Sequence, residues 1–232
     1  MTEFKRGFMA GIPIALGYFA VSFTFGIVAV SGGLNWWEAT LISALNLTSA
    51  GQFAGLNIML AGGTLIEMAL SQFVINLRYA LMSIALSQKA EKSISIPRRC
   101  FYAFFHTDEV FAVAAGEKTF TKKFFNGLIA TPCVGWTLGT LCGAVGGEIL
   151  PEMLCNALGI ALYGMFIAIF VPAAKKSSKA MWVVLIAVFL SCCFYYIPGL
   201  NKVSSGFAII ICAVAAAAIA AVLFPVEEEE EA

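Results

Sequence analysis

Apolar residues fall into runs long enough to cross a lipid bilayer, a task that takes about 20 mainly apolar residues in a helix. The uninterrupted long runs lie at residues 11–31, 64–87, 124–147, 152–173, 180–198 and 203–224. A shorter run at 100–117 and a run at 36–60 that polar residues interrupt complete the series. The pattern predicts an all-α fold: a polytopic membrane helix bundle with about seven transmembrane segments and at least one broken or re-entrant helix.

Composition points to the same class of protein. Hydrophobic residues make up 60% and charged residues 12% of the 232 positions, whereas soluble domains average about 45–50% and 25%. The 14 Lys and Arg residues balance 14 Asp and Glu residues. No basic excess is left to neutralise phosphates, so we expect no nucleic-acid partner. We expect a single transmembrane domain over residues 1–226, surrounded by the lipid bilayer, and an acidic solvated tail over 227–232.

Basic residues in short connections set the orientation of such a bundle, because they stay in the cytoplasm. Lys5 and Arg6 therefore place the N-terminus in the cytoplasm, in a multi-pass protein of the inner (cytoplasmic) membrane. The first apolar run exceeds the about 7–15 residues of a signal-peptide core, so we interpret it as a transmembrane helix. The basic connections at 118–123 and 173–180 agree with this orientation if both are also cytoplasmic.

The number of crossings before the connection at 118–123 is the difficulty in this topology. Three crossings before residue 89 would leave that connection outside. Either the run at 100–117 also crosses the membrane, or the interrupted run at 36–60 is re-entrant. The second arrangement also places the basic residues between 89 and 99 inside, so charge favours it. Both arrangements put polar groups at membrane depth, which is tolerated only against protein or a water-lined cavity.

A weak internal repeat relates residues 21–53 to 134–166, with nine identities among 33 aligned positions. Transporters are commonly built from repeats, with the substrate site at the repeat interface. If each repeat held an odd number of crossings, the two would be inverted in the membrane. A stripe of glycines at a spacing of four, Gly135, Gly139 and Gly143, lies in the second copy. It predicts a face on which another helix packs closely.

The first candidate site is a polar cluster in the middle of the run at 36–60. Its substrate-binding candidates are Asn46, Thr48, Ser49, Gly51 and Gln52. Such side chains compete with helical hydrogen bonds and glycine loosens the backbone, so we expect a discontinuous helix. The second half of a broken helix begins with free N–H groups that favour an anion such as a carboxylate. The alternative is that these small residues only let two helices pack closely.

The second candidate site lies in the run at 64–87. Gln72, Asn76 and Tyr79 fall on one helix face at i, i+4 and i+7. Arg78 lies beside them, and an isolated arginine at mid-membrane costs about 2.5 kcal/mol or more. We therefore expect Arg78 to face protein, within reach of a carboxylate or a carbonyl. All four residues are substrate-binding candidates, and the alternative for Arg78 is a purely structural ion pair with one of the carboxylates described next.

The third candidate site is the sequence His106-Thr107-Asp108-Glu109 within the run at 100–117. Two adjacent carboxylates in apolar surroundings do not both ionise easily, so one is expected to hold a proton. Intramembrane carboxylates mark ion pathways or proton relays, and we assign Asp108 and Glu109 to proton coupling. If 100–117 is only an interfacial helix, both carboxylates simply face water.

Enzymatic chemistry has little support in the sequence. His106 is the single histidine, and the seven cysteines include no C-x-x-C pair. We expect no metal site, no cofactor and no enzymatic activity, although an intramembrane enzyme using His106, Asp108, Glu109 and Ser49 is a rival hypothesis. No G-x-x-x-x-G-K-[ST] motif is present, so transport would be driven by an ion gradient or the membrane potential. A channel or a structural membrane subunit is the other alternative.

Four stretches together resemble the AzlC-type branched-chain amino-acid exporters. They are Gly17-Tyr18-Phe19-Ala20-Val21-Ser22-Phe23-Thr24-Phe25-Gly26, Ser49-Ala50-Gly51-Gln52-Phe53, Asn76-Leu77-Arg78-Tyr79 and Thr107-Asp108-Glu109-Val110-Phe111-Ala112. The resemblance implies a permease that is the large subunit of a two-component exporter. Its implied substrates are leucine, isoleucine and valine, with methionine as a further candidate, and its implied partner is a small AzlD-type membrane subunit. The C-terminal third carries no matching motif, and the site roles above do not come from the family.

Overall fold

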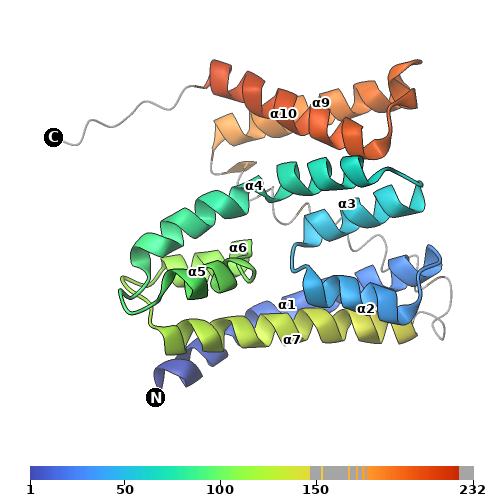
Figure 1. Ribbon diagram of the computed structural model, residues 1–232. Helices are drawn as coiled ribbons and strands as arrows, with labels where there is room; N and C mark the ends of the chain where they lie inside the picture. Colours follow the sequence, from blue (N-terminus) through green and yellow to red (C-terminus); the bar gives the residue numbers. More distant parts are fainter. Residues whose placement is uncertain (147–152, 154–166, 168–170, 172–173, 176, 225–232) are drawn as a thin grey trace. The chain divides into compact units, whose positions relative to one another are not determined.

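The computed structural model describes residues 1–146, 153, 167, 171, 174–175 and 177–224, which are almost entirely helical (Figure 1). The helices are α1 (Glu3–Ser31), α2 (Trp36–Leu45), α3 (Ser49–Leu60), α4 (Leu65–Lys89), α5 (Ile96–Ala103), α6 (Asp108–Ala115), α7 (Lys122–Gly146), α9 (Ser178–Tyr196) and α10 (Ser205–Leu223), with a 3₁₀ turn η1 (Leu200–Lys202). No β-strand occurs among the described residues. The expectation of an all-α polytopic membrane protein is confirmed.

The chain forms two compact units. The first contains Met1–Phe53 and Asn76–Leu162, and the second contains Ala54–Ile75 and Tyr163–Ala232. Two of the three boundaries between the units fall inside helices α3 and α4, so these two helices contribute to both units. Each unit is described by itself below, and the expectation of a single transmembrane domain stays a prediction.

Five of the described helices are long and apolar enough to cross a membrane: α1, α4, α7, α9 and most of α10. They match the runs expected at 11–31, 64–87, 124–147, 180–198 and 203–224. The run expected at 152–173 and the acidic tail at 227–232 lie outside the described residues, apart from a few isolated positions. The internal repeat is described only in part for the same reason.

Helices α1 and α7 form the centre of the first unit, and glycine brings them together. A Cβ added at Gly135, Gly139 or Gly143 would overlap the backbone of α1 at Ala15, Phe19 and Phe23 respectively, so the predicted close-packing face is confirmed. Glycines of α1 approach α7 in the same way: Gly7, Gly11 and Gly26. Residue numbers rise together along the contact, so the two helices run parallel (Figure 1).

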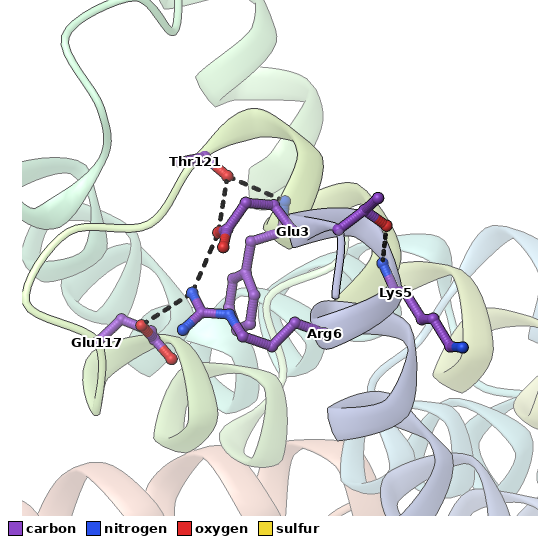
Figure 2. A network of polar contacts seen from close by, with 7 residues as sticks. Glu3, Lys5, Arg6, Glu117 and Thr121 are labelled. Atoms are coloured by element: carbon purple, nitrogen blue, oxygen red, sulfur yellow. Dashed lines mark hydrogen bonds and ion pairs between the residues drawn. The ribbon is translucent and has the colours of Figure 1, made fainter.

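The N-termini of α1 and α7 are joined by a polar network (Figure 2). The Arg6 guanidinium donates to Glu3 and to Glu117, at 3.1 Å each, and lies over the Phe124 ring at 4.6 Å. The Thr121 hydroxyl accepts from the backbone N–H of Phe124, and so satisfies a free donor in the first turn of α7. The same hydroxyl donates to the Glu3 carboxylate at 3.4 Å. This network fixes the register in which the two helices start at the same end.

The two ends of the segment between α4 and α7 lie side by side. The backbone N–H of Phe120 donates to Lys89, and that of Glu91 donates to Phe120, which forms an isolated bridge between Ala90 and Phe120. The Lys89 ammonium also donates to the carbonyl of Ala115. Because both ends of the segment meet here, α5 and α6 fold back between them instead of continuing in one direction.

The run expected at 100–117 is wrong as a single segment. It forms two eight-residue helices, α5 and α6, separated by residues 104–107. Eight residues of helix span about 12 Å, well short of the about 30 Å hydrocarbon core. The interruption has a local cause, because the Thr107 hydroxyl accepts from the N–H of Val110 and caps α6. The carboxylates of Asp108 and Glu109 then occupy the first turn, where the helix dipole favours them.

In the second unit, α9 and α10 pack side by side (Figure 1). Glu67 of α4, which is 3% exposed, caps α10, because its carboxylate accepts from the Ser204 hydroxyl at 2.6 Å and from the N–H of Gly206 at 2.9 Å. Glu67 lies in the first turn of α4. The structure shows a buried carboxylate that satisfies the free donors at a helix terminus.

Candidate functional site

The first element of the site is the break between α2 and α3. Asn46 leaves the helix with extended backbone, and its side chain accepts from the N–H of Thr48 at 3.2 Å. The Thr48 hydroxyl accepts from the N–H of Gly51 at 3.3 Å, which satisfies a donor in the first turn of α3. The break expected between Asn46 and Phe53 is confirmed, and its polar side chains supply the hydrogen bonds that an uninterrupted helix would have made.

A buried polar cluster holds this break against α7. The Gln52 amide donates to Ser43 and accepts from the Trp136 indole N–H at 3.1 Å, and Ser43 lies 2.6 Å from the Thr140 hydroxyl. All four side chains are 0–1% exposed. Nine residues of continuous helix would separate Ser43 from Gln52 by about 13 Å, so their hydrogen bond shows that the chain folds back at the break.

The second element is the break between α5 and α6. His106 lies in it, 7% exposed, with its Nδ1 2.6 Å from the Ser83 hydroxyl of α4. Its ring meets that of Phe125 edge-on at 5.7 Å. Just before the break, Tyr102 of α5 donates to the Asn126 side chain at 2.7 Å and packs on the Phe125 ring. The hairpin of α5 and α6 is thereby fastened to both α4 and α7.

A cavity of about 180 Å³ lies where the two breaks meet within the first unit. Leu45, Asn46, Leu47 and Thr48 line it from the first break, and Ala103, Phe104 and His106 line it from the second. Asn76 and Tyr79 of α4 complete the lining. The walls combine hydroxyl, amide and imidazole groups with leucine and phenylalanine side chains. This volume is below the about 300–1,000 Å³ of pockets for drug-sized ligands, so it suits a smaller molecule.

Charged groups adjoin this cavity through Tyr79. The Arg78 guanidinium pairs with Asp108 at 2.9 Å and donates to the Tyr79 hydroxyl at 3.2 Å. That hydroxyl in turn donates to Thr48 at 3.4 Å. Arg78 is therefore paired with a carboxylate, as expected from the cost of a lone guanidinium in apolar surroundings. Its side chain is 43% exposed, so the described part of the chain does not enclose the ion pair completely.

The second carboxylate of α6 has a different partner. Glu109 accepts a hydrogen bond from the Tyr18 hydroxyl of α1. The Tyr18 ring also packs edge-on against Trp136 at 5.3 Å, beside the buried Gln52 amide. Asp108 thus pairs with a cation of α4, and Glu109 accepts from a phenol of α1. Through these two contacts, α6 is connected to both α4 and α1.

The predicted substrate-binding residues occupy different places. Four of them line the cavity: Asn46, Thr48, Asn76 and Tyr79. Arg78 does not line it but donates a hydrogen bond to Tyr79, which does. Ser49 starts α3, Gly51 donates to Thr48, and Gln52 is committed to its buried partners. Gln72 belongs to the second unit, where its amide lies 3.9 Å from the Met68 sulfur. The substrate role of each residue stays a prediction.

Sequence reasoning gave no site role to Tyr18 or Ser83, and gave His106 a role only in the rival enzyme hypothesis, yet the structure brings all three to this region. Tyr18 and Ser83 are polar groups inside long apolar helices, and this is the signal that could have found them. Within the described part of the chain, no group of three His, Cys, Asp or Glu side chains is placed to hold a metal ion.

The region from Pro13 to the end of α7 coincides with a known family. The family model described as "AzlC protein" matches residues 13–150, more than half of the chain. The chain belongs to the AzlC family. Every residue of the cavity and of the two carboxylate pairs lies inside the matched range. This membership makes the chain a membrane protein of a transport-related family.

Membrane proteins of bacteria and archaea are similar to this AzlC-family chain over most of its length. A membrane protein of Archaeoglobus fulgidus is 32% identical over 174 residues, which cover 74% of this chain and 76% of the relative. Inner membrane protein YgaZ of Escherichia coli is 25% identical, covering 84% and 83% of the two chains. A membrane protein of Helicobacter pylori is 24% identical, covering 81% and 84%. No solved structure matches the chain.

Proposed function

We propose that the protein is a secondary transporter that exports branched-chain amino acids, as the large subunit of a two-component exporter in the inner membrane. The observation that carries the proposal is the small cavity at the junction of two helix breaks, which combines polar groups with apolar walls and adjoins a cation and a carboxylate. Family membership and the inner-membrane location named for the similar YgaZ support it.

The cavity has the chemistry that a zwitterion with an apolar side chain requires. The substrate's carboxylate would be met by the N-terminus of α3 or by Arg78, and its ammonium by Asp108 or by the side-chain oxygens of Asn46 and Asn76. Leucine and phenylalanine side chains from the two breaks would surround the branched side chain. Such a site favours leucine, isoleucine and valine over amino acids with charged side chains.

Competition for the Arg78–Asp108 pair supplies a means of coupling. A substrate carboxylate at Arg78, or a substrate ammonium at Asp108, weakens the contact that the two side chains make in its absence. The displaced carboxylate, or Glu109 next to it, can then take up or release a proton. Proton movement and substrate binding are thereby linked through one ion pair, which agrees with a transporter that lacks a nucleotide-binding motif.

Neither broken segment crosses the membrane in this proposal. The hairpin of α5 and α6 starts and ends at the bridge between Ala90 and Phe120, which supports a re-entrant path. Parallel α1 and α7 require an even number of crossings from the start of one to the start of the other. With α1 and α4 crossing, α2 and α3 then contribute none. The basic residues at both ends of the α5–α6 segment lie together on the cytoplasmic side, as the positive-inside rule requires.

The partner in this proposal is a small AzlD-type membrane subunit, which the resemblance to AzlC-type exporters implies. The experiment therefore reconstitutes both subunits in liposomes loaded with unlabelled leucine and adds labelled leucine outside. A transporter accumulates label transiently above equilibrium, a channel only equilibrates it, and an enzyme converts it. We expect accumulation with internal leucine, isoleucine or valine and none with internal lysine. Failure of all three to support accumulation would contradict the proposal.

A matched pair of variants tests whether the cavity is the site. Tyr79→Phe removes the hydroxyl that joins Thr48 to Arg78, whereas Tyr195→Phe removes an exposed hydroxyl of α9. A hydrogen bond worth about 0.5–1.5 kcal/mol corresponds to a loss of about 2- to 10-fold in leucine counterflow for the first variant. The second variant should transport like the wild type. Equal activity in both variants would remove Tyr79 from the site.

A further inference from the structure

A second cavity in the first unit, of about 350 Å³, has no role in the site described above. It lies between the C-terminal part of α4 and α5, and its walls are mainly apolar. Ile84, Leu86, Ile96 and Phe120 are among the residues that line it. Its lining includes Ala90 and Phe120, the two residues of the backbone bridge at which the α5–α6 hairpin begins and ends. The cavity therefore lies near the basic residues at the two ends of the α5–α6 segment.

Arg99 places one cationic group in the wall of this second cavity. Its Nε donates to the carbonyl of Ile94 at 3.0 Å, and its Nη1 donates to the carbonyl and the hydroxyl of Ser87 at 2.8 and 2.7 Å. These three bonds fix the guanidinium plane and do not use Nη2. A planar guanidinium held in this way is well suited to a carboxylate, because little side-chain freedom is lost on binding.

The two cavities share two lining residues, Ala103 and His106. The His106 ring, paired with Ser83 at 2.6 Å, therefore borders both cavities. A ligand that moved from the larger cavity to the smaller one would pass this pair. The larger cavity offers an apolar wall and one guanidinium, and the smaller one offers apolar walls and several neutral polar groups, so both suit the same kind of molecule.

We propose that the larger cavity is a second substrate site, a cytoplasmic vestibule in which Arg99 binds the carboxylate of a branched-chain amino acid. The His106–Ser83 pair separates this vestibule from the smaller cavity and opens when substrate passes. This inference rests on the transport function proposed above and adds to it a site for substrate before translocation. Arg99 selects a free carboxylate, and the apolar wall selects an uncharged side chain.

Cys100 provides a direct test, because it lines the vestibule and is exposed. In a complex whose only cysteine is Cys100, a membrane-impermeant maleimide added to inverted vesicles should label it, and leucine should slow the labelling. Lysine should not slow it. The matched control carries Lys92→Cys in a background without Cys100, on an exposed residue of the same connection that does not line the vestibule. Labelling that leucine leaves unchanged at Cys100, or slows equally at both positions, would overturn the proposal.

Two further variants separate the vestibule from the smaller cavity. Arg99→Gln should raise the leucine concentration for half-protection of Cys100 by about 10- to 100-fold, the value of a hydrogen bond to a charged group, and Arg99→Lys should restore part of it. Tyr79→Phe should weaken counterflow and leave that concentration unchanged. If Tyr79→Phe shifts protection as strongly as Arg99→Gln, the protection reports the smaller cavity and the vestibule is refuted.

Wild-type counterflow, measured beside the labelling, separates the two proposals. Counterflow without protection of Cys100 refutes the vestibule alone. Protection without counterflow keeps the vestibule as a leucine site and refutes the transport function.

Discussion

The contact between α1 and α7 predicts different effects for two glycine-to-alanine substitutions. At Gly143, an added Cβ would lie 2.7 Å from the carbonyl carbon and 2.9 Å from the Cα of Phe23. These are backbone atoms that cannot rotate away, so the helices would have to separate. Overpacking of this kind costs about 1–3 kcal/mol. At Gly17 of α1, an added Cβ meets no heavy atom within 4 Å.

Comparing the two variants with each other isolates the packing cost. Both gain the same conformational advantage of alanine over glycine, about 0.5–1 kcal/mol in a helix interior. Gly17→Ala should therefore stabilise the protein slightly, and Gly143→Ala should be about 1–3 kcal/mol less stable than Gly17→Ala. At about 2–4 °C per kcal/mol for a chain of this size, their denaturation midpoints should differ by roughly 2–12 °C.

The assay is thermal denaturation of the purified protein in mild detergent, followed as loss of the folded peak in size-exclusion chromatography. The two variants and the wild type are heated at the same rate in the same detergent. If Gly143→Ala melts at or above the midpoint of Gly17→Ala, the close approach of the two backbones is not a feature of the folded protein.

Three further predictions concern charged and buried polar groups. Arg78→Lys should lose at least about tenfold in leucine counterflow, because lysine cannot keep the planar contacts of a guanidinium; wild-type flux would argue against a direct role. Asp108→Asn and Glu109→Gln should each preserve exchange and abolish gradient-driven efflux, measured in the same proteoliposomes at two pH values; driven efflux with unchanged pH dependence would make both carboxylates structural. Gln52→Leu should destabilise the protein by about 1–3 kcal/mol, because it leaves a buried indole N–H unpaired, whereas Gln88→Leu on the exposed surface of α4 should have little effect on the melting midpoint.

The helix breaks could be predicted from the sequence, because they depend on side chains that hydrogen-bond to backbone groups a few residues away. The break at Asn46 follows from amide, hydroxyl and glycine residues inside an apolar run, all of which act on their own backbone. The second break could have been found by the same reasoning. Thr107 followed by two acidic residues is typical of a helix N-terminus, but the apolar residues on both sides of the sequence His106–Glu109 made it look like one segment.

Partners distant in sequence could not be predicted in the same way. Tyr18 and Glu109 are 91 positions apart, and Gln52 and Trp136 are 84 apart. A polar residue in an apolar run needs a partner, but composition does not tell whether that partner is a substrate or another side chain. Gln52 and Asn46 are both amide residues within the same apolar run. In the structure, Gln52 is held in a buried cluster, whereas Asn46 lines a cavity.

The parallel contact of α1 and α7 also has a consequence for biosynthesis. Roughly ninety residues separate the end of α1 from the start of α7, so at about 5–20 residues per second α1 waits roughly 5–20 s for its partner. During that interval its glycine surface, with Gly7, Gly11 and Gly26, is covered by lipid chains or by the insertion machinery. Before α7 can pack on this surface, the lipid chains or the insertion machinery must be displaced from it. The rate at which α7 enters the bilayer therefore limits when the first unit can close around its two helix breaks.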